Sequence, residues 1–464
     1  MIIMKTDKKY IFYTSLFTFF LLAYMIAISV ADEFGSTYDW PVSHYYPGIA
    51  RLLGFISFAL SRRLMDNERI RRILLIFANI IYLICAMTLI FDQASVPVLL
   101  PVLLLSFSAG HLGGLIYYCI CAAFTTSDHK GKVIGISCAL SILLQFLLTG
   151  AATTIIRLVI SIVIFLLISY LILRTPSDYI LEDMLPYSEE SREFRHSVNS
   201  QLASIIIIIV ICTLLACRSD IAFVSMARKG NVNIYSYPRL AMAAGYLLMG
   251  FAADHKDRRA VFSIFFGGVL LSSLLILMPF TDGGYSLLLG IYYFFISIYI
   301  FFYTYCFISI APRTRTPELW ACAGRLLSDL LTVIISSVML AIDVEKLNSS
   351  GISYALYYIG LLFLLHIFLS FRRIDPNLTE ETGTYKNESD RDLAYSLRDR
   401  LNEYSLTPRE KDVAYILITT NKPIKAIAAD LGISERSVYR FAASIYEKTG
   451  TDGRTGLIRK FPAA

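Results

Sequence analysis

Several signatures of catalysis and of metal binding are missing from this chain of 464 residues. Histidine occurs only 6 times, and there is no phosphate-binding glycine loop, HExxH motif, nucleophile elbow or kinase signature. The 8 cysteines include no CxxC pair and lie in or beside apolar runs, so we expect packing residues rather than disulfides or metal ligands. These absences argue against an enzyme, a bound cofactor and a metal site.

Charge is also scarce, at 17% of residues, whereas hydrophobic residues make up 56% and the mean hydropathy is +0.60. Such a balance predicts that most of the chain lies in a lipid bilayer. Apolar runs of about 18 to 28 residues follow one another up to residue 371, each long enough to cross a hydrocarbon core of about 30 Å. The twelve expected spans are 10–31, 41–61, 70–91, 96–125, 131–150, 153–173, 201–226, 235–253, 260–279, 285–311, 319–342 and 351–371.

Lysine and arginine fall mostly on one side of these spans. The opposite loops carry Asp32, Glu33, Asp39, Asp92 and Asp282 and almost no bases, with Arg228, Lys229 and Lys346 as exceptions. The basic side of a multi-pass protein faces the cytoplasm. Because the number of expected spans is even, we expect both termini to be cytoplasmic, with the protein in the inner or plasma membrane.

A short pattern recurs after the second and the eighth expected span, with the same offsets of four, eight and nine residues. The two sets are Gly54, Phe58, Arg62 and Arg63, and Gly250, Asp254, Arg258 and Arg259. The second set, GFAADHKDRR, resembles the cytoplasmic loop signature of the major facilitator superfamily, in which a helix-ending acid and a basic pair lock neighbouring spans. The resemblance implies two six-span halves, 1–173 and 201–371, joined by a cytoplasmic connector, 174–200. Phe58 stands where that family has Asp in its first half, which favours a fold retained for sensing.

Ionisable residues inside lipid are costly, so each one in a span is a candidate for function. The candidates are Arg51, His111, Arg218, Asp220, Arg239, Arg325 and Asp329. Several arginines in the central cavity of a facilitator-like fold would suit a carboxylate or another small anion through forked hydrogen bonds. An unidentified small-molecule ligand is therefore an expected partner.

Structural explanations stay open for the same residues. Arg325 and Asp329 are four residues apart and can neutralise each other on one helix face. His111, among small residues, can be a packed and hydrogen-bonded core histidine. Arg218 and Asp220 can extend toward the interface, and Arg239 beside Pro238 can anchor one.

Residues 372–404 form an acidic linker, since 374–404 carry eight acids and four bases. If flexible, a segment of this length spans on the order of 30 Å, which keeps the following domain near the membrane. Leucine and tyrosine at 393, 397, 401 and 404 favour a short amphipathic helix that pairs with another copy or with the next domain. A solvated tether is the other interpretation.

The last sixty residues, 405–464, have the composition of a small soluble domain. Apolar residues recur near a period of 3.6 in three blocks, which predicts three or four short helices. Thr407, Pro408 and Glu410 form a capping signal for the first helix. Gly432 marks a turn, and Ser434 is placed to cap a second helix.

These residues resemble the LuxR-type helix-turn-helix. The family's opening LTxRExxV, core IAxxLxISxxTV and closing IxxKxG stand here as Leu406, Thr407, Arg409, Glu410 and Val413; as Ile427, Ala428, Leu431, Ile433, Ser434, Ser437 and Val438; and as Ile445, Lys448 and Gly450. Ala426, Phe441 and Thr449 differ from the usual residues. With the spans above, we expect an all-α protein: a twelve-helix transmembrane bundle of two six-helix halves, and a small C-terminal four-helix LuxR-type domain.

Double-stranded promoter DNA is the partner that this resemblance implies. From residue 405 onward, ten bases and six acids give a net charge of +4, against −4 in the linker. The second helix of a helix-turn-helix enters the major groove, so we expect Arg436, Tyr439, Arg440 and Ala443, with neighbouring Ser437, to face DNA. Lys425, Lys448 and Arg454 are the expected phosphate partners. LuxR-type domains pair through their last helix, which implies a homodimer through Arg454 to Phe461.

Two functions from different classes follow. The first is a membrane-embedded one-component transcription regulator, whose spans sense a small molecule and whose last domain binds DNA. The second is a facilitator-type transporter, whose last domain regulates it or docks a partner.

Overall fold

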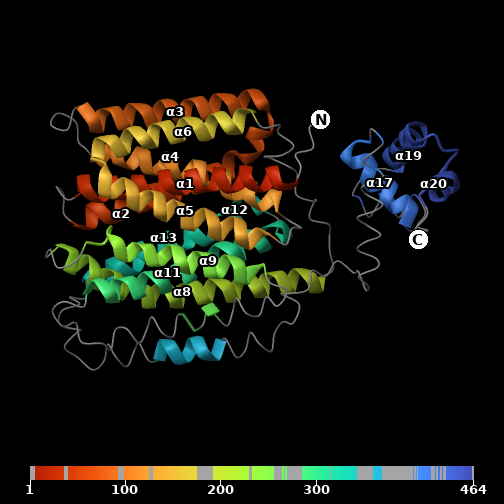
Figure 1. Cartoon of the computed structure of the whole chain (residues 1–464). Helices are drawn as coiled ribbons and strands as arrows, with labels where there is room; N and C mark the ends of the chain where they lie inside the picture. Colours follow the sequence, from red (N-terminus) through yellow and green to blue (C-terminus); the bar gives the residue numbers. More distant parts are fainter. Residues whose placement is uncertain are drawn as a thin grey trace. The chain divides into compact units, whose positions relative to one another are not determined.

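The computed structural model is built of helices, and they group into two compact units (Figure 1). Unit 1 comprises Met1–Leu185 and Ser191–Asp375, and unit 2 comprises Pro186–Glu190 and Pro376–Ala464. The structure describes residues 6–35, 40–91, 99–124, 129–174, 192–228, 233–254, 264–265, 267–268, 285–314, 316–341, 359–367, 401, 404, 406–419, 424, 427–428, 431 and 435–461. All regular elements in this part of the chain are helical, which confirms the predicted fold class.

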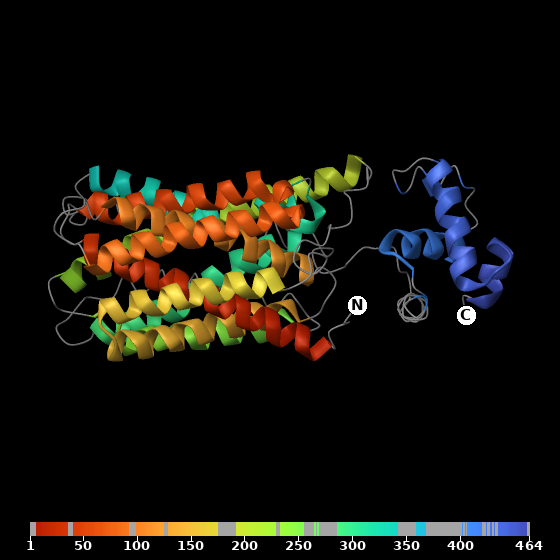
Figure 2. The ribbon, with the colours of Figure 1, turned by 90° about the horizontal axis from the view of Figure 1, so that it is seen from above.

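Unit 1 is a bundle of long helices that run alongside one another in two perpendicular views (Figures 1 and 2). Its helices are α1 (Thr6–Gly35), α2 (Trp40–Ser61), η1 (Arg62–Asp66), α3 (Glu68–Phe91), α4 (Leu99–Ala123), α5 (Lys130–Ala151), α6 (Thr154–Arg174), α8 (Arg192–Arg228), η2 (Tyr237–Arg239), α9 (Leu240–Ala253), α11 (Tyr285–Ile310), η4 (Ala311–Arg313), α12 (Pro317–Trp320) and α13 (Ala323–Ala341).

Among the described residues, 6 helices are long and apolar enough to cross a bilayer: Lys9–Ala31, Glu68–Phe91, Leu99–Ala123, Lys130–Ala151, Thr154–Leu173 and Tyr285–Arg313. Shorter apolar helices cover Tyr46–Ser61 and Val198–Leu214. The expected spans 260–279 and 351–371 lie mostly outside the described residues. The bundle is therefore a multi-pass membrane unit, and the count of twelve stays a prediction.

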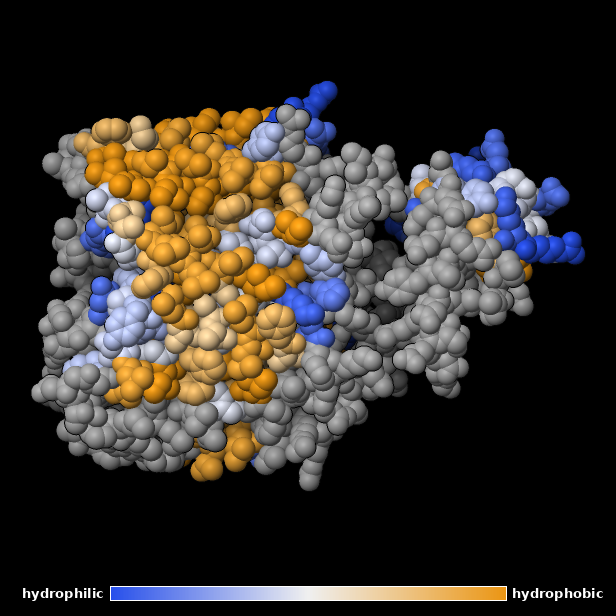
Figure 3. All heavy atoms as spheres, in the orientation of Figure 1, coloured by the Kyte–Doolittle hydropathy of each residue, from blue (hydrophilic) through white to orange (hydrophobic). Residues whose placement is uncertain are grey.

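Helix α3 shows how the bundle separates lipid-facing from inward-facing residues. One face is exposed and apolar, and it contributes to the broad hydrophobic surface in Figure 3. Its exposed residues are Ile73, Ile76, Phe77, Ile80 and Ile84. The opposite face is buried and includes Leu75, Tyr82, Cys85, Ala86 and Leu89. Because lipid tails are as apolar as these side chains, the exposed face fits a bilayer.

The two sequence halves meet where α5 packs on α9 and α2 packs on α13. At the first contact, a Cβ atom added to Gly135 would lie 2.7 Å from the Cα atom of Gly250. Small residues let membrane helices approach this closely. Any larger residue at Gly135 would push the two halves apart.

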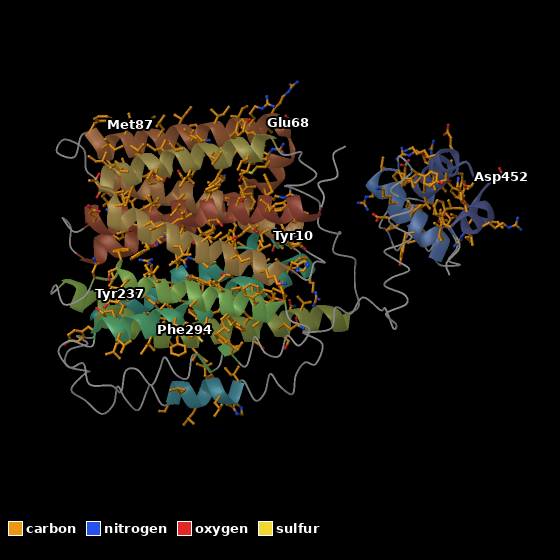
Figure 4. The ribbon with its side chains drawn as sticks, viewed as in Figure 1. Tyr10, Glu68, Met87, Tyr237, Phe294 and Asp452 are labelled. Atoms are coloured by element: carbon orange, nitrogen blue, oxygen red, sulfur yellow. The ribbon has the colours of Figure 1, made fainter. Side chains whose placement is uncertain are left out.

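The directions of α1 and α3 can be followed from residues labelled in Figure 4. Tyr10 in α1 and Glu68 at the start of α3 lie at one end of the bundle, whereas Met87 in α3 and Tyr237 in η2 lie at the opposite end. Helices α1 and α3 therefore start at the same end, as expected for two spans with one span, α2, between them.

Unit 2 contains α17 (Pro408–Thr419), α19 (Glu435–Thr449) and α20 (Arg454–Lys460). Gly450, which follows α19, has φ +63, the left-handed conformation in which helices commonly end at glycine. The three helices share one hydrophobic core, made of Leu401, Leu406, Val413, Ala414, Leu417, Ile418, Ile427, Ala428, Val438, Ala442, Ile445, Leu457 and Phe461. Unit 2 thus has a core of its own.

Candidate functional site

A cluster of charged and tyrosine side chains is buried where α1, α2, α11 and α13 meet. Arg325 Nε lies 3.3 Å from Asp329 Oδ1, and Arg51 Nε lies 3.6 Å from Asp329 Oδ2. The Tyr24 hydroxyl donates to Asp329 Oδ2 at 3.0 Å and accepts from Arg325 Nε at 2.9 Å. Arg325 Nη1 also donates to the Tyr303 hydroxyl at 3.1 Å. We call these five residues the arginine cluster, and it joins helices from both halves.

The arginine cluster carries two guanidinium groups and one carboxylate. The side chains of Arg51, Arg325 and Asp329 are 11%, 20% and 10% exposed, so this charge is largely withdrawn from solvent. Arginine stays protonated in proteins, which leaves one positive charge without a matching acid in the cluster. Arg51 Nε is buried and donates no hydrogen bond to any described residue. A small anion would balance this charge.

Three of the predicted ligand residues therefore meet at one place. Local neutralisation of Arg325 by Asp329 is present, but the carboxylate is shared with Arg51 from α2. Sequence reasoning missed Tyr24 and Tyr303, which complete the cluster. The sequence gives little indication of their role, because a tyrosine in an apolar run looks like an ordinary packing residue. Its only distinguishing feature is a hydroxyl group that needs a hydrogen-bond partner when buried.

His111 makes different contacts from the arginine cluster. Its Nδ1 lies 2.7 Å from Ser57 Oγ, and its ring meets Phe58 edge-on with centroids 6.1 Å apart. Both partners are on α2, so His111 joins α4 to α2 within the first half. In this arrangement it acts as a hydrogen-bonded packing residue.

Arg239 lies between two tyrosines. Its guanidinium carbon is 4.9 Å from the centroid of the Tyr235 ring and 6.0 Å from that of Tyr293. Such cation–π contacts hold an arginine at a fixed position near a helix start. The side chains of Arg218 and Asp220, in contrast, lie outside the described residues, although α8 continues through both positions.

Asp254, the acid of the repeated loop pattern, caps a helix of the other half. Its two carboxylate oxygens accept hydrogen bonds from the backbone N–H groups of Gly131 at 2.7 Å and Lys132 at 2.8 Å. These N–H groups belong to the first turn of α5, where a carboxylate is favoured by the helix dipole. The contact ties the two halves at one end of the α5–α9 crossing.

The predicted capping signal at the start of α17 is confirmed. Thr407 N–H donates to Glu410 Oε2 at 2.7 Å, and Glu410 N–H donates to Thr407 Oγ1 at 3.3 Å. Glu410 has two further partners on α19, since Ser444 Oγ donates to Oε1 at 2.6 Å and Lys448 Nζ to Oε2 at 2.7 Å. This buried carboxylate therefore links α17 to α19.

Helix α19 presents a continuous exposed face. Arg436, Tyr439, Arg440 and Ala443 are all exposed, and their spacing of three, four and seven residues places them on one side of the helix. Tyr439 is 61% exposed, which is unusual for a large aromatic side chain in a soluble domain. The opposite side, with Val438, Ala442, Ile445 and Thr449, is buried. The exposed face is basic and aromatic, and it is available to a partner.

The remaining predicted DNA residues are placed differently. Lys448 is held by Glu410, with its side chain 33% exposed, and Arg454 Nε donates to the Leu417 carbonyl at 3.0 Å. Ser437 is half-buried beside the exposed face. The side chain of Lys425 lies outside the described residues. Lys448 and Arg454 thus have structural partners within unit 2.

The end of the linker belongs to the core of unit 2. Leu401 is fully buried there, and the ring of Tyr404 meets that of Phe461 edge-on at 5.5 Å. Lys460 Nζ lies 4.8 Å from the centroid of the Tyr404 ring and donates to the Thr449 carbonyl at the end of α19. Leu401 therefore belongs to the core of unit 2, and Tyr404 packs against the end of the last helix, α20. The predicted partners Leu393 and Leu397 lie outside the described residues.

Within the described residues, no group of three His, Cys, Asp or Glu side chains is arranged to hold a metal ion. What the structure does provide is a lipid-facing bundle with a buried charged cluster, and a small helical unit with an exposed basic helix. The two are parts of one chain.

The C-terminal unit is a LuxR-type helix-turn-helix domain. Residues 404–461 match the family model described as "Bacterial regulatory proteins, luxR family", which confirms the resemblance found in the sequence. No curated protein sequence matches the chain.

The membrane unit has a major-facilitator-like fold. One similar solved structure is the human organic anion transporter MFSD10 (TETRAN), with a TM-score of 0.50 and 11% identity, covering 78% of this chain and 100% of that one. Another is a bacterial homologue of the iron transporter ferroportin in an outward-facing state, with a TM-score of 0.53 and 14% identity, covering 80% of this chain and 99% of that one. At these identities the similarity concerns the fold.

Proposed function

We propose that this protein is a membrane-embedded one-component transcription regulator, in which the bundle senses a small molecule and the LuxR-type domain binds promoter DNA. The observation that carries the proposal is the joining of the two parts in a single chain. A helix-turn-helix domain binds DNA. Because this domain is covalently joined to a membrane bundle, a ligand that changes the bundle can change DNA binding.

For the DNA-binding part, we assign base contacts to the exposed face of α19. Arg436 and Arg440 supply forked donors that match guanine, and Tyr439 supplies an exposed aromatic ring. Ser437 and Ala443 flank these contacts, and Lys425, Lys448 and Arg454 serve the phosphate backbone. Two copies of the domain pair as a homodimer through Arg454 to Phe461, which would set the spacing of two half-sites on DNA.

For the sensing part, we assign a small anion to the arginine cluster. Two features support this assignment: the positive charge that Asp329 leaves uncompensated, and the Nε of Arg51, which donates no hydrogen bond to any described residue. A carboxylate ligand would compete with Asp329 for Arg51 and Arg325, which lie on helices of different halves. A ligand of this kind would favour one arrangement of the halves only if it binds the two arrangements unequally.

We place the protein in the inner or plasma membrane with both termini in the cytoplasm. The support is the one-sided distribution of lysine and arginine in the loops, together with the need of a DNA-binding domain to reach DNA.

The Arg440→Ala variant of the 400–464 fragment tests the DNA-binding role. Unit 2 has its own core, and Arg440 is exposed, so the variant should fold as the wild type does. We expect binding to a duplex selected from random sequences to weaken by about 1–3 kcal/mol. The far-UV circular dichroism spectrum should stay unchanged. Equal binding by both proteins would remove the assignment of Arg440.

A transporter is the second candidate, because the similar solved structures are of a transporter and of a transporter homologue. In that case the LuxR-type domain regulates transport or docks a partner. Uptake of an organic anion into vesicles carrying the protein, undiminished after residues 400–464 are deleted, would favour this function. Loss of a transcriptional response on the same deletion, without any uptake, would favour the regulator.

A further inference from the structure

A second pair of buried arginines lies at the start of α3, separate from the arginine cluster. Arg62 in η1 is 6% exposed, and Arg71 in the first turn of α3 is 2% exposed. Arg62 Nη2 donates to the Tyr118 hydroxyl at 3.0 Å, and its guanidinium lies 4.8 Å from the centroid of that ring. Both guanidinium groups are close enough to the Cys119 thiol on α4 to act on it electrostatically.

Arg71 differs from the next residue, Arg72, in making no ion pair with any acid whose side chain the structure describes. Its Nε and Nη1 are buried, and neither donates a hydrogen bond to any described residue. The next residue, Arg72, shows the ordinary arrangement: it is 59% exposed and pairs with Glu68 at 2.8 Å. Arg71 instead shares the inward face of α3 with Leu75 and Tyr82.

An isolated buried guanidinium is not a stable arrangement. Arginine does not release its proton at accessible pH, so it cannot relieve the charge as a buried lysine does. Removing an ion from water without a partner costs several kcal/mol. The start of α3 adds positive potential at the same place, because the first N–H groups of a helix point outward there. The site therefore calls for an anion from outside the described residues.

We propose that Arg71, together with Arg62 and the first turn of α3, forms a binding site for a phosphate group, supplied by an anionic phospholipid. The exposed apolar residues of α3 begin at Ile73, two residues after Arg71. The first turn therefore lies at the depth of lipid headgroups (Figure 4, where Glu68 marks this end). Free phosphate has the same chemistry and is the other source to be tested.

The full chain in lipid-free detergent tests this proposal. We add one of three compounds: phosphatidylglycerol, phosphatidylcholine or inorganic phosphate. Two quantities are then measured, the thermal unfolding temperature and, by native mass spectrometry, the number of bound lipids. Arg71→Met keeps the side-chain stem and removes the charge. Arg72→Met removes the same charge one residue away, at the exposed and paired position, and serves as the matched control.

We expect phosphatidylglycerol to stabilise the wild type and Arg72→Met, and Arg71→Met to bind this lipid about tenfold more weakly or worse. Without any anion, Arg71→Met should be more stable than the wild type, since it removes an uncompensated charge. A response to inorganic phosphate equal to that of phosphatidylglycerol would assign the site to free phosphate.

Three results would overturn the proposal: an unchanged lipid response in Arg71→Met, no response of the wild type to either phosphate source, or a partner within the chain. The last is tested with Asp66→Asn, because Asp66 lies five residues before Arg71, whereas the nearer acid, Glu68, pairs with Arg72. If Asp66→Asn and Arg71→Met destabilise the lipid-free protein equally and not additively, the counter-charge is Asp66. If Arg71→Met does not fold, Arg71→Lys replaces it, since lysine keeps the positive charge but lacks the forked donors of a guanidinium group. Fewer bound lipids in Arg71→Lys than in the wild type would support the proposal, and an equal number would contradict it. None of these measurements depends on DNA binding.

Discussion

Lys448 Nζ and Glu410 Oε2 lie 2.7 Å apart and join α19 to α17 within the LuxR-type domain. Glu410 is 5% exposed. Burial alone would raise the pKa of this carboxyl, but hydrogen bonds from Lys448, Ser444 and Thr407 outweigh it and lower the pKa to about 2. One carboxylate thus caps α17 and fixes the position of α19 against it.

Replacing Glu410 by Gln should make the domain less stable at neutral pH. The folded-state pKa lies below the ordinary value of 4.5, so the ionised carboxylate contributes stability above pH 4.5 and loses it as the pH falls toward 2. The contribution is on the order of 3 kcal/mol. Urea unfolding of the 400–464 fragment across this pH range measures it. The difference between wild type and variant should shrink on acidification, and a difference independent of pH would contradict the assignment.

Lys448→Met should affect both stability and DNA binding. It removes a partner of Glu410, and it removes a charge that we assign to phosphate contact. We expect a lower unfolding temperature and a dependence of log affinity on log salt that is less steep by about 1. Arg409→Met is the control, because Arg409 is an exposed base on α17 that belongs neither to the residues assigned to DNA nor to the proposed dimer surface. If Lys448→Met leaves the salt dependence unchanged, its role is structural alone.

Replacement by Ala should affect different properties at two tyrosines of this domain, stability at Tyr404 and DNA binding at Tyr439. Tyr404 packs on Phe461 and beneath Lys460, so Tyr404→Ala should destabilise the 400–464 fragment by about 1–3 kcal/mol. Tyr439 is 61% exposed, so Tyr439→Ala should leave stability within about 0.5 kcal/mol and weaken DNA binding. Thermal unfolding and fluorescence anisotropy separate the two effects. Equal stability of both variants would show that the linker end is not part of the folded domain.

In the membrane unit, Asp329→Asn should be more harmful than removal of a complete pair. The single change leaves Arg51 and Arg325 without a carboxylate, and breaking a buried ion pair costs about 3–5 kcal/mol. The double variant Arg325→Met with Asp329→Leu keeps the net charge of the wild-type cluster. We expect its thermal stability in detergent to lie closer to the wild type. A double variant less stable than Asp329→Asn would contradict this charge count.

Local features of the fold were predictable from the sequence. The capping pair of Thr407 and Glu410 is three residues apart, and the exposed face of α19 repeats with the period of a helix, so neither depends on distant parts of the chain. The same is true of Arg325 and Asp329, one turn apart on α13. Helix geometry alone brings such residues together.

Only the tertiary structure decided which distant residues join them. Arg51 and Tyr24 reach Asp329 across more than 270 positions of sequence, because α2 packs beside α13 and the Tyr24 side chain extends from α1 to the same place. No local pattern encodes these contacts. Lys448 was expected at DNA phosphates, but the packing of α19 on α17 gives it Glu410 as a partner. The sequence by itself determined the lipid-embedded helices and the LuxR-type domain, since hydropathy and helix period are local properties. Packing decided the composition of the buried charged sites, because a charge withdrawn from water is stabilised by whatever the neighbouring helices bring to it.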